Sequence, residues 1–333
     1  MADEMYPIDF VLTWVDDTDP VWRKKKALYT GKMTTEGNTE VRYRDWDTLK
    51  YWFRGVEKFA PWVRNVYFVT DNQKPEWLNI DHPKLKWVKH TDFIPDEYLP
   101  TFNSNAIEWN MHRIEELSDY FVYFNDDMFV IKETVPEDFF VDGQPCDYPI
   151  LGMLYADGVF SNMLFNDAEL INRNFSFREA LTQNWKKWVA KQSVSGLIKL
   201  LWYGRRDCLS ASVNAHIHNS YKKESFRILW EREYDAVHRT CQSRQRERTN
   251  VTSWCIRDWQ LLSGDFYVNK PIGKLFHTAT MRYSDEAIQY LRKQKGKVIC
   301  LNDTEDEKDF ELHKKMIVDE FEKIFPEKSS FEL

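Results

Sequence analysis

The chain has 333 residues, of which 43% are hydrophobic, and it contains only 11 glycines and 12 prolines. This composition is typical of an ordered globular protein and excludes a disordered or a fibrous one. The formal net charge of −7 argues against binding of nucleic acid through a broad basic face.

The cysteines and the apolar runs bear on the compartment. The five cysteines are widely spread and include no C-x-x-C pair, which disfavours a disulfide framework or a zinc site and fits a reducing compartment. The N-terminal stretch MADEMYPIDF is acidic and does not resemble a signal peptide. No run approaches the roughly 20 apolar residues that span a bilayer. We therefore expect a cytoplasmic protein that is soluble or peripheral on the inner face of the cell membrane.

Strands and helices are predicted to alternate over the first 130 residues. Short runs of β-branched and aromatic residues, followed by turn-forming residues, predict strands over residues 8–15, 63–72, 85–95 and 120–130. Apolar residues at helical spacing predict helices over residues 45–59 and 103–117. This alternation implies an α/β fold with a mostly parallel sheet and right-handed crossovers.

The rest of the chain is predicted to be mostly helical up to residue 265. It then closes with a helix, the short strand KVICL, an acidic loop and a last helix. We therefore predict an α/β core over residues 1–155, a mostly helical subdomain over 156–265, and strand and helix elements over 266–333 that return to the core.

Acidic residues follow three of the predicted strands. Asp126 and Asp127 interrupt the apolar run YFVYFNDDMFV, and the first two strands are followed by Asp16, Asp17 and Asp71. The carboxyl ends of parallel strands lie along one edge of a sheet, where ligands bind. Carboxylates gathered there repel one another unless a cation lies among them, and oxygen ligands suit Mg²⁺ or Mn²⁺. A metal-bridged diphosphate, typically of a nucleotide sugar, would fit; the alternative is a solvated acidic turn.

Three histidines are candidates for chemistry. His216 and His218 would not share a helical face, so they make a poor metal pair. One of them could act as an acid, a base or a phosphate ligand, and the alternative is an ordinary histidine. His112 lies on a predicted helix with Asn105 and Glu108 at spacings that put all three on one face.

Two segments are rich in positive charge. HRTCQSRQRER, residues 238–248, contains several arginines, whose guanidinium groups suit phosphate oxygens unless they form an exposed face. WKKWVAKQSVSGLIKLLWYGRR, residues 185–206, carries six positive charges and no acid. A basic segment with tryptophan suits peripheral contact with an anionic membrane, and the alternative is a basic helical face packed on the domain.

Several stretches together resemble the conserved blocks of the Stealth family. Its first two blocks resemble IDFVLTWVDDTDPVW, RYRDWDTLKYWFRGVEKFAPWVRNVYFVTDNQKPEWL, LPTFNSNAIEWNMHRI and FVYFNDDMFV. Its third block resembles NAHIHNSYKKESF with RTCQSRQRERTNVTSW, and its fourth resembles VICLNDTEDE through FPEKSSFE. The resemblance covers nearly the whole chain in the family's order, and the first two blocks are long and specific.

The resemblance implies a Rossmann-like (GT-A-like), mostly parallel sheet with a helical insertion, and it implies an enzyme. Stealth proteins move a sugar together with its β-phosphate from a nucleotide sugar, usually a UDP-hexose or UDP-N-acetylhexosamine, to a sugar hydroxyl. UMP leaves, and the product carries a phosphodiester. For a bacterial, capsule-type member the expected partners are a UDP-sugar donor, bound by residues 1–155, and a polyprenyl-diphosphate-linked oligosaccharide acceptor, served by residues 156–265.

The resemblance also implies a metal site and a base. Asp127 is expected to bind Mg²⁺ or Mn²⁺, with Asn302 and Asp303 as further ligands. Asp126 is the first choice for the base that receives the acceptor's proton, and His216 is the second. Phosphoryl transfer depends on such positioning and on neutralisation of charge, so the chemistry of these residues agrees with the expected reaction.

The remaining implied roles concern the donor. Arg248 and His216 are expected to hold the β-phosphate and to stabilise its developing charge, and Arg246 is close enough in sequence to compete with Arg248. The other residues expected to bind substrate are Trp14, Asp16, Asp17, Arg44, Asp71, Asn105 and His112.

Other classes of protein remain open. A metal-dependent glycosyltransferase with the same sheet would transfer the sugar alone and release UDP. A metal-dependent phosphohydrolase would turn over without an acceptor. A non-catalytic carbohydrate-binding protein would account for the tryptophans but not for the acids that recur at strand ends.

Overall fold

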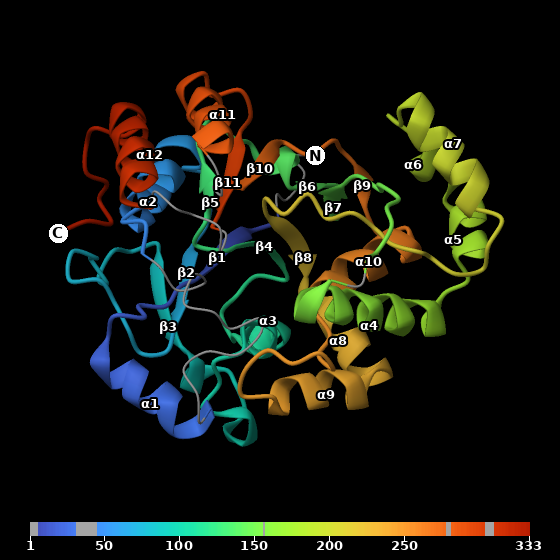
Figure 1. Ribbon diagram of the computed structural model, residues 1–333, viewed down its shortest axis with the longest axis horizontal. Helices are drawn as coiled ribbons and strands as arrows, with labels where there is room; N and C mark the ends of the chain where they lie inside the picture. The colour runs from blue at the N-terminus through green and yellow to red at the C-terminus, as the bar shows by residue number, and fades with distance from the viewer. Residues whose placement is uncertain (1–5, 31–44, 156, 278–280, 304–309) are drawn as a thin grey trace.

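A five-stranded sheet lies at the centre of the computed structural model, which describes residues 6–30, 45–155, 157–277, 281–303 and 310–333 (Figure 1). Its strand order is β3-β2-β1-β4-β8. β1 (Ile8–Thr13) pairs in parallel with β2 (Val66–Thr70) and β4 (Tyr120–Phe124), and β2 pairs in parallel with β3 (Leu85–Lys89). The predicted α/β fold with a mostly parallel sheet is therefore confirmed.

The helices of the N-terminal part agree with the prediction except for one. α2 (Leu49–Phe59) and α3 (Ser104–Asn110) lie within the predicted ranges, and α3 continues into a short 3₁₀ turn at Met111–Arg113. α1 (Pro20–Thr30) was not predicted. Pro20 occupies the first helical position, where its missing N–H group is tolerated.

The predicted strand over residues 120–130 is two strands that belong to different sheets. β4 ends at Phe124, and β5 (Met128–Val130) pairs antiparallel with β11 (Val298–Asn302). β11 in turn pairs in parallel with β10 (Gly273–His277). The prediction of one continuous strand is wrong, because the polar residues 125–127 form a turn between the sheets and do not continue a buried strand.

The middle of the chain supplies mostly helices, as predicted. They are α4 (Gly158–Asn174), α5 (Phe177–Gln183), α6 (Trp185–Val189), α7 (Val194–Tyr203), α8 (Lys223–Arg232), α9 (Tyr234–Gln242) and α10 (Trp254–Ser263). This segment also contributes an unpredicted strand, β8 (Asn219–Lys222), which pairs antiparallel with β4 at the edge of the central sheet. The middle segment is thus part of the sheet that it covers.

The remaining elements are small strands and two C-terminal helices. A third sheet has the order β6-β7-β9, with β6 at Phe140–Val141, β7 at Gln144–Asp147 and β9 at Tyr267–Val268. α11 (Met281–Arg292) and α12 (Phe310–Ile324) flank β11, as predicted. Within the described ranges, no helix combines the length and the apolarity that crossing a membrane requires.

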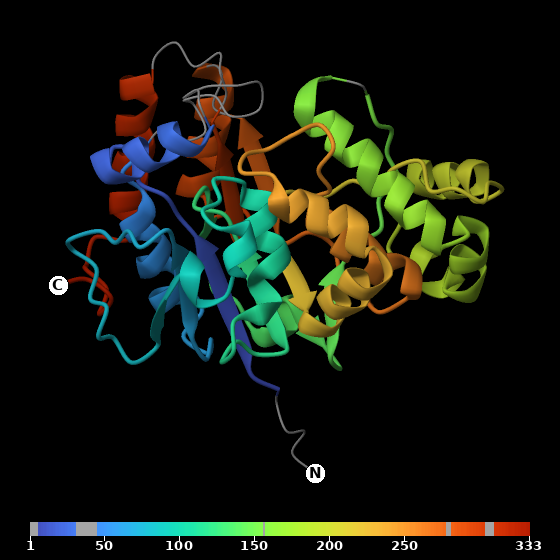
Figure 2. The same cartoon turned by 90° about the horizontal axis from the view of Figure 1, so that it is seen from below.

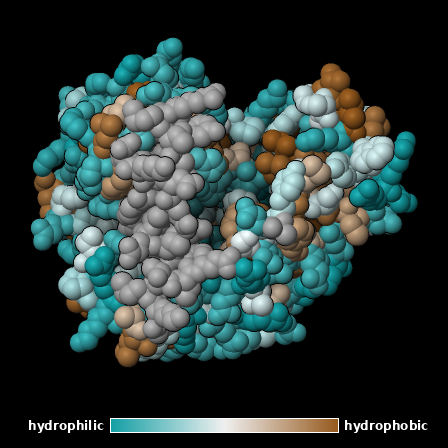
Figure 3. All heavy atoms as spheres, viewed as in Figure 1, coloured by the Kyte–Doolittle hydropathy of each residue, from teal (hydrophilic) through white to brown (hydrophobic). Residues whose placement is uncertain are grey.

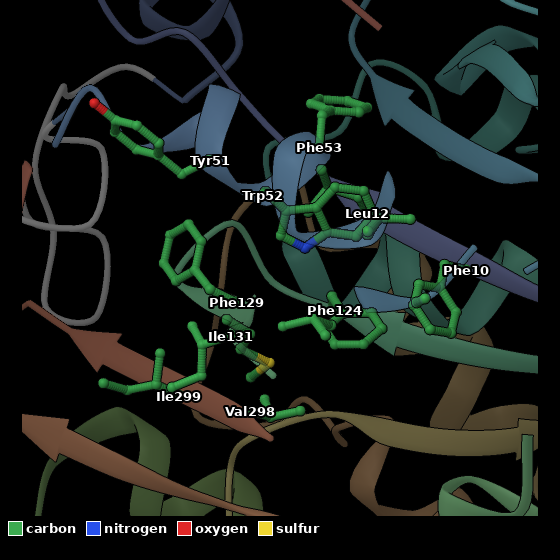
Figure 4. Packing of buried hydrophobic residues seen from close by; sticks show 14 of the residues in the cluster. Phe10, Leu12, Tyr51, Trp52, Phe53, Phe124, Phe129, Ile131, Val298 and Ile299 are labelled. Atoms are coloured by element: carbon green, nitrogen blue, oxygen red, sulfur yellow. The ribbon is translucent and has the colours of Figure 1, made fainter. Parts of the chain in front are cut away.

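Alternate residues of the central strands enter two separate cores. Phe10 and Leu12 of β1 pack with α2, α12 and the second sheet, whereas Val11 between them packs with α3, α8 and α10. Figure 2 shows these two groups of helices on opposite sides of the strands. In the first core, the rings of Trp52 and Phe124 meet edge to face at 5.8 Å (Figure 4). Both faces of the sheet are therefore buried.

One glycine sets the distance between α2 and the second sheet. A Cβ atom built at Gly55 would lie 2.4 Å from the carbonyl oxygen of Val130, which is closer than carbon and oxygen atoms can approach without a shift of the backbone. Glycine at this position therefore allows the helix to lie directly against β5.

A buried ion pair ties the C-terminus to α2. Nε and Nη2 of Arg54 donate to the two carboxylate oxygens of Glu332 over 2.8 Å each, and only 7% and 5% of the two side chains are exposed. Burial alone would raise the pKa of Glu332, but the hydrogen bonds from Arg54 and Ser329 outweigh it and hold the pKa below its ordinary value.

Glu332→Gln should lower the free energy of unfolding by about 3 kcal/mol at neutral pH, because it removes the buried counter-charge of Arg54 and leaves only a half-exposed carboxylate 3.5 Å away. The folded-state pKa of Glu332 is depressed, so its contribution is present above the unfolded-state pKa and is lost as the pH falls through the folded-state value. Urea unfolding of both proteins at neutral pH and through an acid series measures the difference, which should narrow in acid.

Glu322→Gln is the matched control for this prediction. Glu322 is a second carboxylate partner of Arg54, at 3.5 Å, and half of its side chain is exposed. We expect its replacement to cost less than about 1 kcal/mol. Equal losses from the two variants would show that the buried pair is not the source of the stability.

Candidate active site

A cavity of about 690 Å³ opens at the carboxyl ends of the parallel strands. Thr13 at the end of β1, Val69 near the end of β2 and Asn125 after β4 line it, together with His277 and Asn302 at the ends of β10 and β11. The two sheets therefore direct their carboxyl ends into one space. The expectation that strand ends gather at a ligand-sized site is confirmed in this geometric sense.

The turn Asn125–Asp127 is held by both sheets. The N–H group of Met128 donates to the carbonyl oxygen of Asn125 over 3.1 Å, and the N–H group of Leu301 in β11 donates to that of Asp127 over 2.8 Å. The hydroxyl group of Tyr123 donates to Oδ1 of Asn125 over 2.6 Å. Because both ends of the turn are fixed, the two acidic side chains are held at the cavity instead of on alternate faces of a strand.

Three potential metal ligands meet at this turn. A carboxylate oxygen of Asp127, a ring nitrogen of His216 and Sγ of Cys300 all lie within 4.8 Å of one another. The β5–β11 register pairs Met128 with Cys300, which brings the thiol next to Asp127. Oδ1 of Asp127 is buried and has no hydrogen-bond partner among the described residues. A buried carboxylate oxygen without a partner, beside an imidazole and a thiol, fits a divalent cation.

The carboxyl group of Asp126 has a raised pKa. Its side chain lines the cavity and is exposed to it. Burial and the neighbouring charge of Asp127 raise the pKa of Asp126 to about 7. A cation bound at Asp127 would lower the pKa of Asp126, because it would place a positive charge where the negative charge of Asp127 now acts.

His216 and His218 lie at a bend before β8 and have different surroundings. His216 lines the cavity, where its ring lies 5.7 Å from that of Trp254. The residue has a φ of 49°, and its N–H group donates to Oδ1 of Asn214 over 2.7 Å. His218 packs between Phe124 and Phe139, and burial lowers its pKa to about 3. Of the two, His216 is the one that lines the cavity, and His218 is half-buried against two phenylalanine rings.

Arg246 and Arg248, the competing arginines, are also separated by the structure. Nε and Nη2 of Arg246 donate to Oγ of Ser104 over 3.2 and 2.6 Å, and Arg246 lines the cavity. Arg248 is exposed and is not among the residues of the cavity wall, and its carbonyl oxygen accepts a hydrogen bond from Asn166. The geometry therefore favours Arg246 over the arginine that the resemblance puts first.

Four further predicted residues line the cavity, namely Trp14, Asp71, Asn302 and Asp303. Nζ of Lys25 donates to both oxygens of Asp71 over 2.7 and 2.8 Å. Nε1 of Trp46 donates to Oδ2 of Asp303 over 3.2 Å. Asp303 is thus on the same wall as the turn, but it is not one of the three ligands that meet at Asp127.

Other predicted residues do not line the cavity. Oδ1 of Asp16 accepts hydrogen bonds from Thr18 in a local turn, and Asp17 lies 3.8 Å from Arg23. Asn105 is buried, and its amide group donates to Sδ of Met163. His112 stacks on Phe226, and burial lowers its pKa to about 3. The structure does not place these four residues in the cavity wall, and Arg44 lies outside the described residues.

Cys300 was not predicted from the sequence as a potential metal ligand. Cys300 lies two residues before Asn302 in a strand, so alternation places both on one face and could have revealed it. Glu108, which is predicted to share a helical face with His112, accepts a hydrogen bond from Ser253 and lies near Arg246, but it is not among the residues of the cavity wall. Burial raises the pKa of Glu108, and these two neighbours act in the opposite direction.

The fold and the cavity define an α/β protein with its ligand site at the carboxyl edge of a mostly parallel sheet. Models of three conserved regions of the Stealth proteins match the chain: region 1 over residues 6–34, region 2 over 42–146 and region 4 over 289–333. The chain belongs to the Stealth family. The residues compared with the third block of the family lie between the last two of these ranges.

Named relatives are similar over nearly the whole length. The capsular polysaccharide phosphotransferase WcwK of Streptococcus pneumoniae is 40% identical over 98% of this chain and 98% of its own. The exopolysaccharide phosphotransferase cps2G of Lactiplantibacillus plantarum is 36% identical over 98% of this chain and 96% of its own. A solved structure of the galactosyltransferase LgtC with donor and acceptor sugar analogs is 11% identical, with a TM-score of 0.38, over 93% of this chain and 95% of its own.

Proposed function

We propose that the chain transfers hexose-1-phosphate or N-acetylhexosamine-1-phosphate from a UDP-sugar to a sugar hydroxyl of a capsular or cell-wall polysaccharide intermediate, with release of UMP. Membership of the Stealth family and the likeness to WcwK and cps2G, both named phosphotransferases of polysaccharides, support a sugar-phosphate transferase. The proposed acceptor is an oligosaccharide carried on polyprenyl diphosphate, which would place the reaction on the cytoplasmic side of the membrane.

The observation that carries the proposal is the convergence of Asp127, His216 and Arg246 on one cavity. A diphosphate brings negative charge to a site that already holds several carboxylates, so its binding needs compensating positive charge. The guanidinium group of Arg246 offers that charge with paired donors, which suit two phosphate oxygens. Asp71 and Trp14, at the ends of β2 and β1, would line the side on which the nucleotide binds.

The cation that we propose is Mg²⁺ or Mn²⁺. Asp127 and His216 would hold it, with Cys300 beside them and with Asn302 and Asp303 on the same wall. The imidazole favours Mn²⁺ of the two, because a transition-metal ion accepts a nitrogen ligand more readily than Mg²⁺ does. When bound, such a cation neutralises charge on the diphosphate.

The transfer itself asks little covalent chemistry of the protein. The acceptor oxygen forms a bond to the β-phosphorus as the bond from that phosphorus to the bridging oxygen of UMP breaks. Asp126, whose carboxylate faces the cavity, would take the acceptor's proton, and His216 is the alternative base. Arg246 would bind the non-bridging oxygens of the β-phosphate and stabilise their negative charge during the transfer.

A donor labelled at the β-phosphorus tests the proposal. Incubated with membranes that carry lipid-linked oligosaccharide, the protein should move the label into the oligosaccharide and release unlabelled UMP. Label recovered only in UDP would instead assign the chain as a glycosyltransferase. Label recovered as free sugar phosphate or inorganic phosphate without acceptor would assign it as a phosphohydrolase.

A further inference from the structure

One helix of the middle segment exposes apolar side chains on its outer face. We call Val194, Leu197, Ile198, Leu201 and Trp202 of α7 the α7 face; their exposed fractions are 77%, 38%, 61%, 72% and 66%. Only Leu200 of this helix is buried. Contiguous exposed apolar side chains of this kind mark an interaction site more often than an ordinary surface.

The apolar stripe of α7 faces away from the core, unlike that of an ordinary surface helix. Val194, Ile198 and Leu201 follow one another at spacings of four and three, so they form one stripe along the helix. This stripe points to solvent, and it leaves only Leu200 of the helix to pack on the protein. Lys199 is also exposed, and its Nζ donates to the carbonyl oxygen of Leu151 over 3.2 Å. A surface helix normally turns its apolar stripe towards the core.

Exposed cations lie on both sides of the α7 face along the sequence. Lys186 precedes it and Arg205 and Arg206 follow it, in a segment of 22 residues without an acid in a chain of net charge −7. The next residue, Asp207, is exposed and lies 3.5 Å from Arg178. One cation of the segment does not add to this exposed positive charge. Nζ of Lys187 donates to the carbonyl oxygens of Gly264 and Phe266, so this lysine holds α6 on the protein.

The α7 face is presented on a fixed support. Trp188 of α6 is buried and its ring lies 5.3 Å from that of Phe177. Helices α5 to α7 form an arm at the upper right of Figure 1, and apolar side chains gather at its outer end in Figure 3. The carbonyl oxygen of Leu151 accepts the hydrogen bond from Lys199, and Leu151 forms a β-bridge with Ser212. This β-bridge connects the arm with the cavity wall at Asn214 and His216.

We infer that the α7 face docks on an anionic lipid bilayer. Leucine, isoleucine and tryptophan side chains enter the boundary between headgroups and acyl chains, and flanking lysine and arginine side chains meet anionic headgroups. A second copy of the chain fits less well, because a two-fold symmetric contact through this face would bring its cations opposite one another. This inference concerns location, so it does not depend on which group the enzyme transfers.

Flotation with lipid vesicles tests the inference. The whole protein is mixed with vesicles of phosphatidylcholine alone, or of phosphatidylcholine with phosphatidylglycerol, at low and at high salt. We expect binding to the anionic vesicles at low salt, weaker binding at high salt, and little binding to phosphatidylcholine. The double variant Leu201→Glu with Trp202→Glu should bind at least about tenfold more weakly, because it removes two apolar anchors and adds two negative charges.

Leu28→Glu in α1 is the matched control, since Leu28 is 77% exposed but lies on a different element. It should bind vesicles as the unchanged protein does, and circular dichroism should show that all variants keep the fold. Absence of binding to anionic vesicles at low salt, equal binding to both lipid compositions, or equal losses in the Leu28 control would each overturn the inference. A dimer that the double variant converts to a monomer, without vesicle binding, would assign the α7 face to self-association instead.

Discussion

Asp127→Asn should lower the turnover of sugar-phosphate transfer by roughly a thousandfold or more, while the protein remains folded. The carboxylate is the one negatively charged member of the group formed with His216 and Cys300, and an amide is a far weaker ligand for a divalent cation. The thermal midpoint should stay the same or rise, since Oδ1 of Asp127 is buried without a hydrogen-bond partner among the described residues. Turnover with the labelled donor and a melting curve measure the two quantities.

Asp119→Asn is the control for loss of a carboxylate. Its side chain is 70% exposed and lies 3.8 Å from Arg227 on the surface. It should change turnover less than about twofold, because an exposed ion pair of this kind contributes little. If Asp127→Asn kept full turnover, or lost it only by unfolding, the proposed cation site would be wrong.

Arg246→Ala should lower turnover by a factor of roughly a thousand, as expected for an arginine that stabilises a phosphoryl group in transit. Arg248→Ala should have a much smaller effect, because Arg248 is exposed and does not line the cavity. Arg246→Lys should recover only part of the loss, since lysine keeps the charge but lacks the paired donors. Steady-state kinetics with varied donor would show whether the loss falls on turnover or on donor binding.

Arg227→Ala is the matched control for removal of a guanidinium group. Arg227 is half exposed, and its partners Asp119 and Glu224 lie on the surface. A larger loss from Arg248→Ala than from Arg246→Ala would restore the assignment that the family resemblance favours and would contradict the geometry of the cavity.

The sequence predicts the first half of the fold well, because its strands are buried on both faces. Such strands read as continuous apolar runs, and β1, β2 and β4 lie where those runs are. β8 was not predicted, because the strand is short and its sequence, NSYK, is mostly polar. Its place in the sheet depends on pairing with a strand about 100 positions earlier in the chain. Pairing over such a distance leaves no local pattern.

The residues of the candidate site can be predicted only in part from the sequence, for a related reason. Acids at strand ends could be located, since strand ends are local features, and Asp71, Asp126 and Asp127 do line the cavity. The sequence does not show in the same way which of two nearby residues faces the cavity. Arg246 and Arg248 differ by two positions in an irregular loop, where no periodicity assigns a direction, and the structure alone separates them.

The antiparallel strand β8 also limits how the chain can be truncated. A shortened chain that stops before α4 would leave the N–H and C=O groups of β4 unpaired along the side that now meets Asn219–Lys222. An exposed strand edge of this kind is a template for addition of further chains. Truncated versions should therefore aggregate when expressed, and we expect that the α/β part before α4 cannot be obtained as a free-standing fragment by removing the segment that follows it.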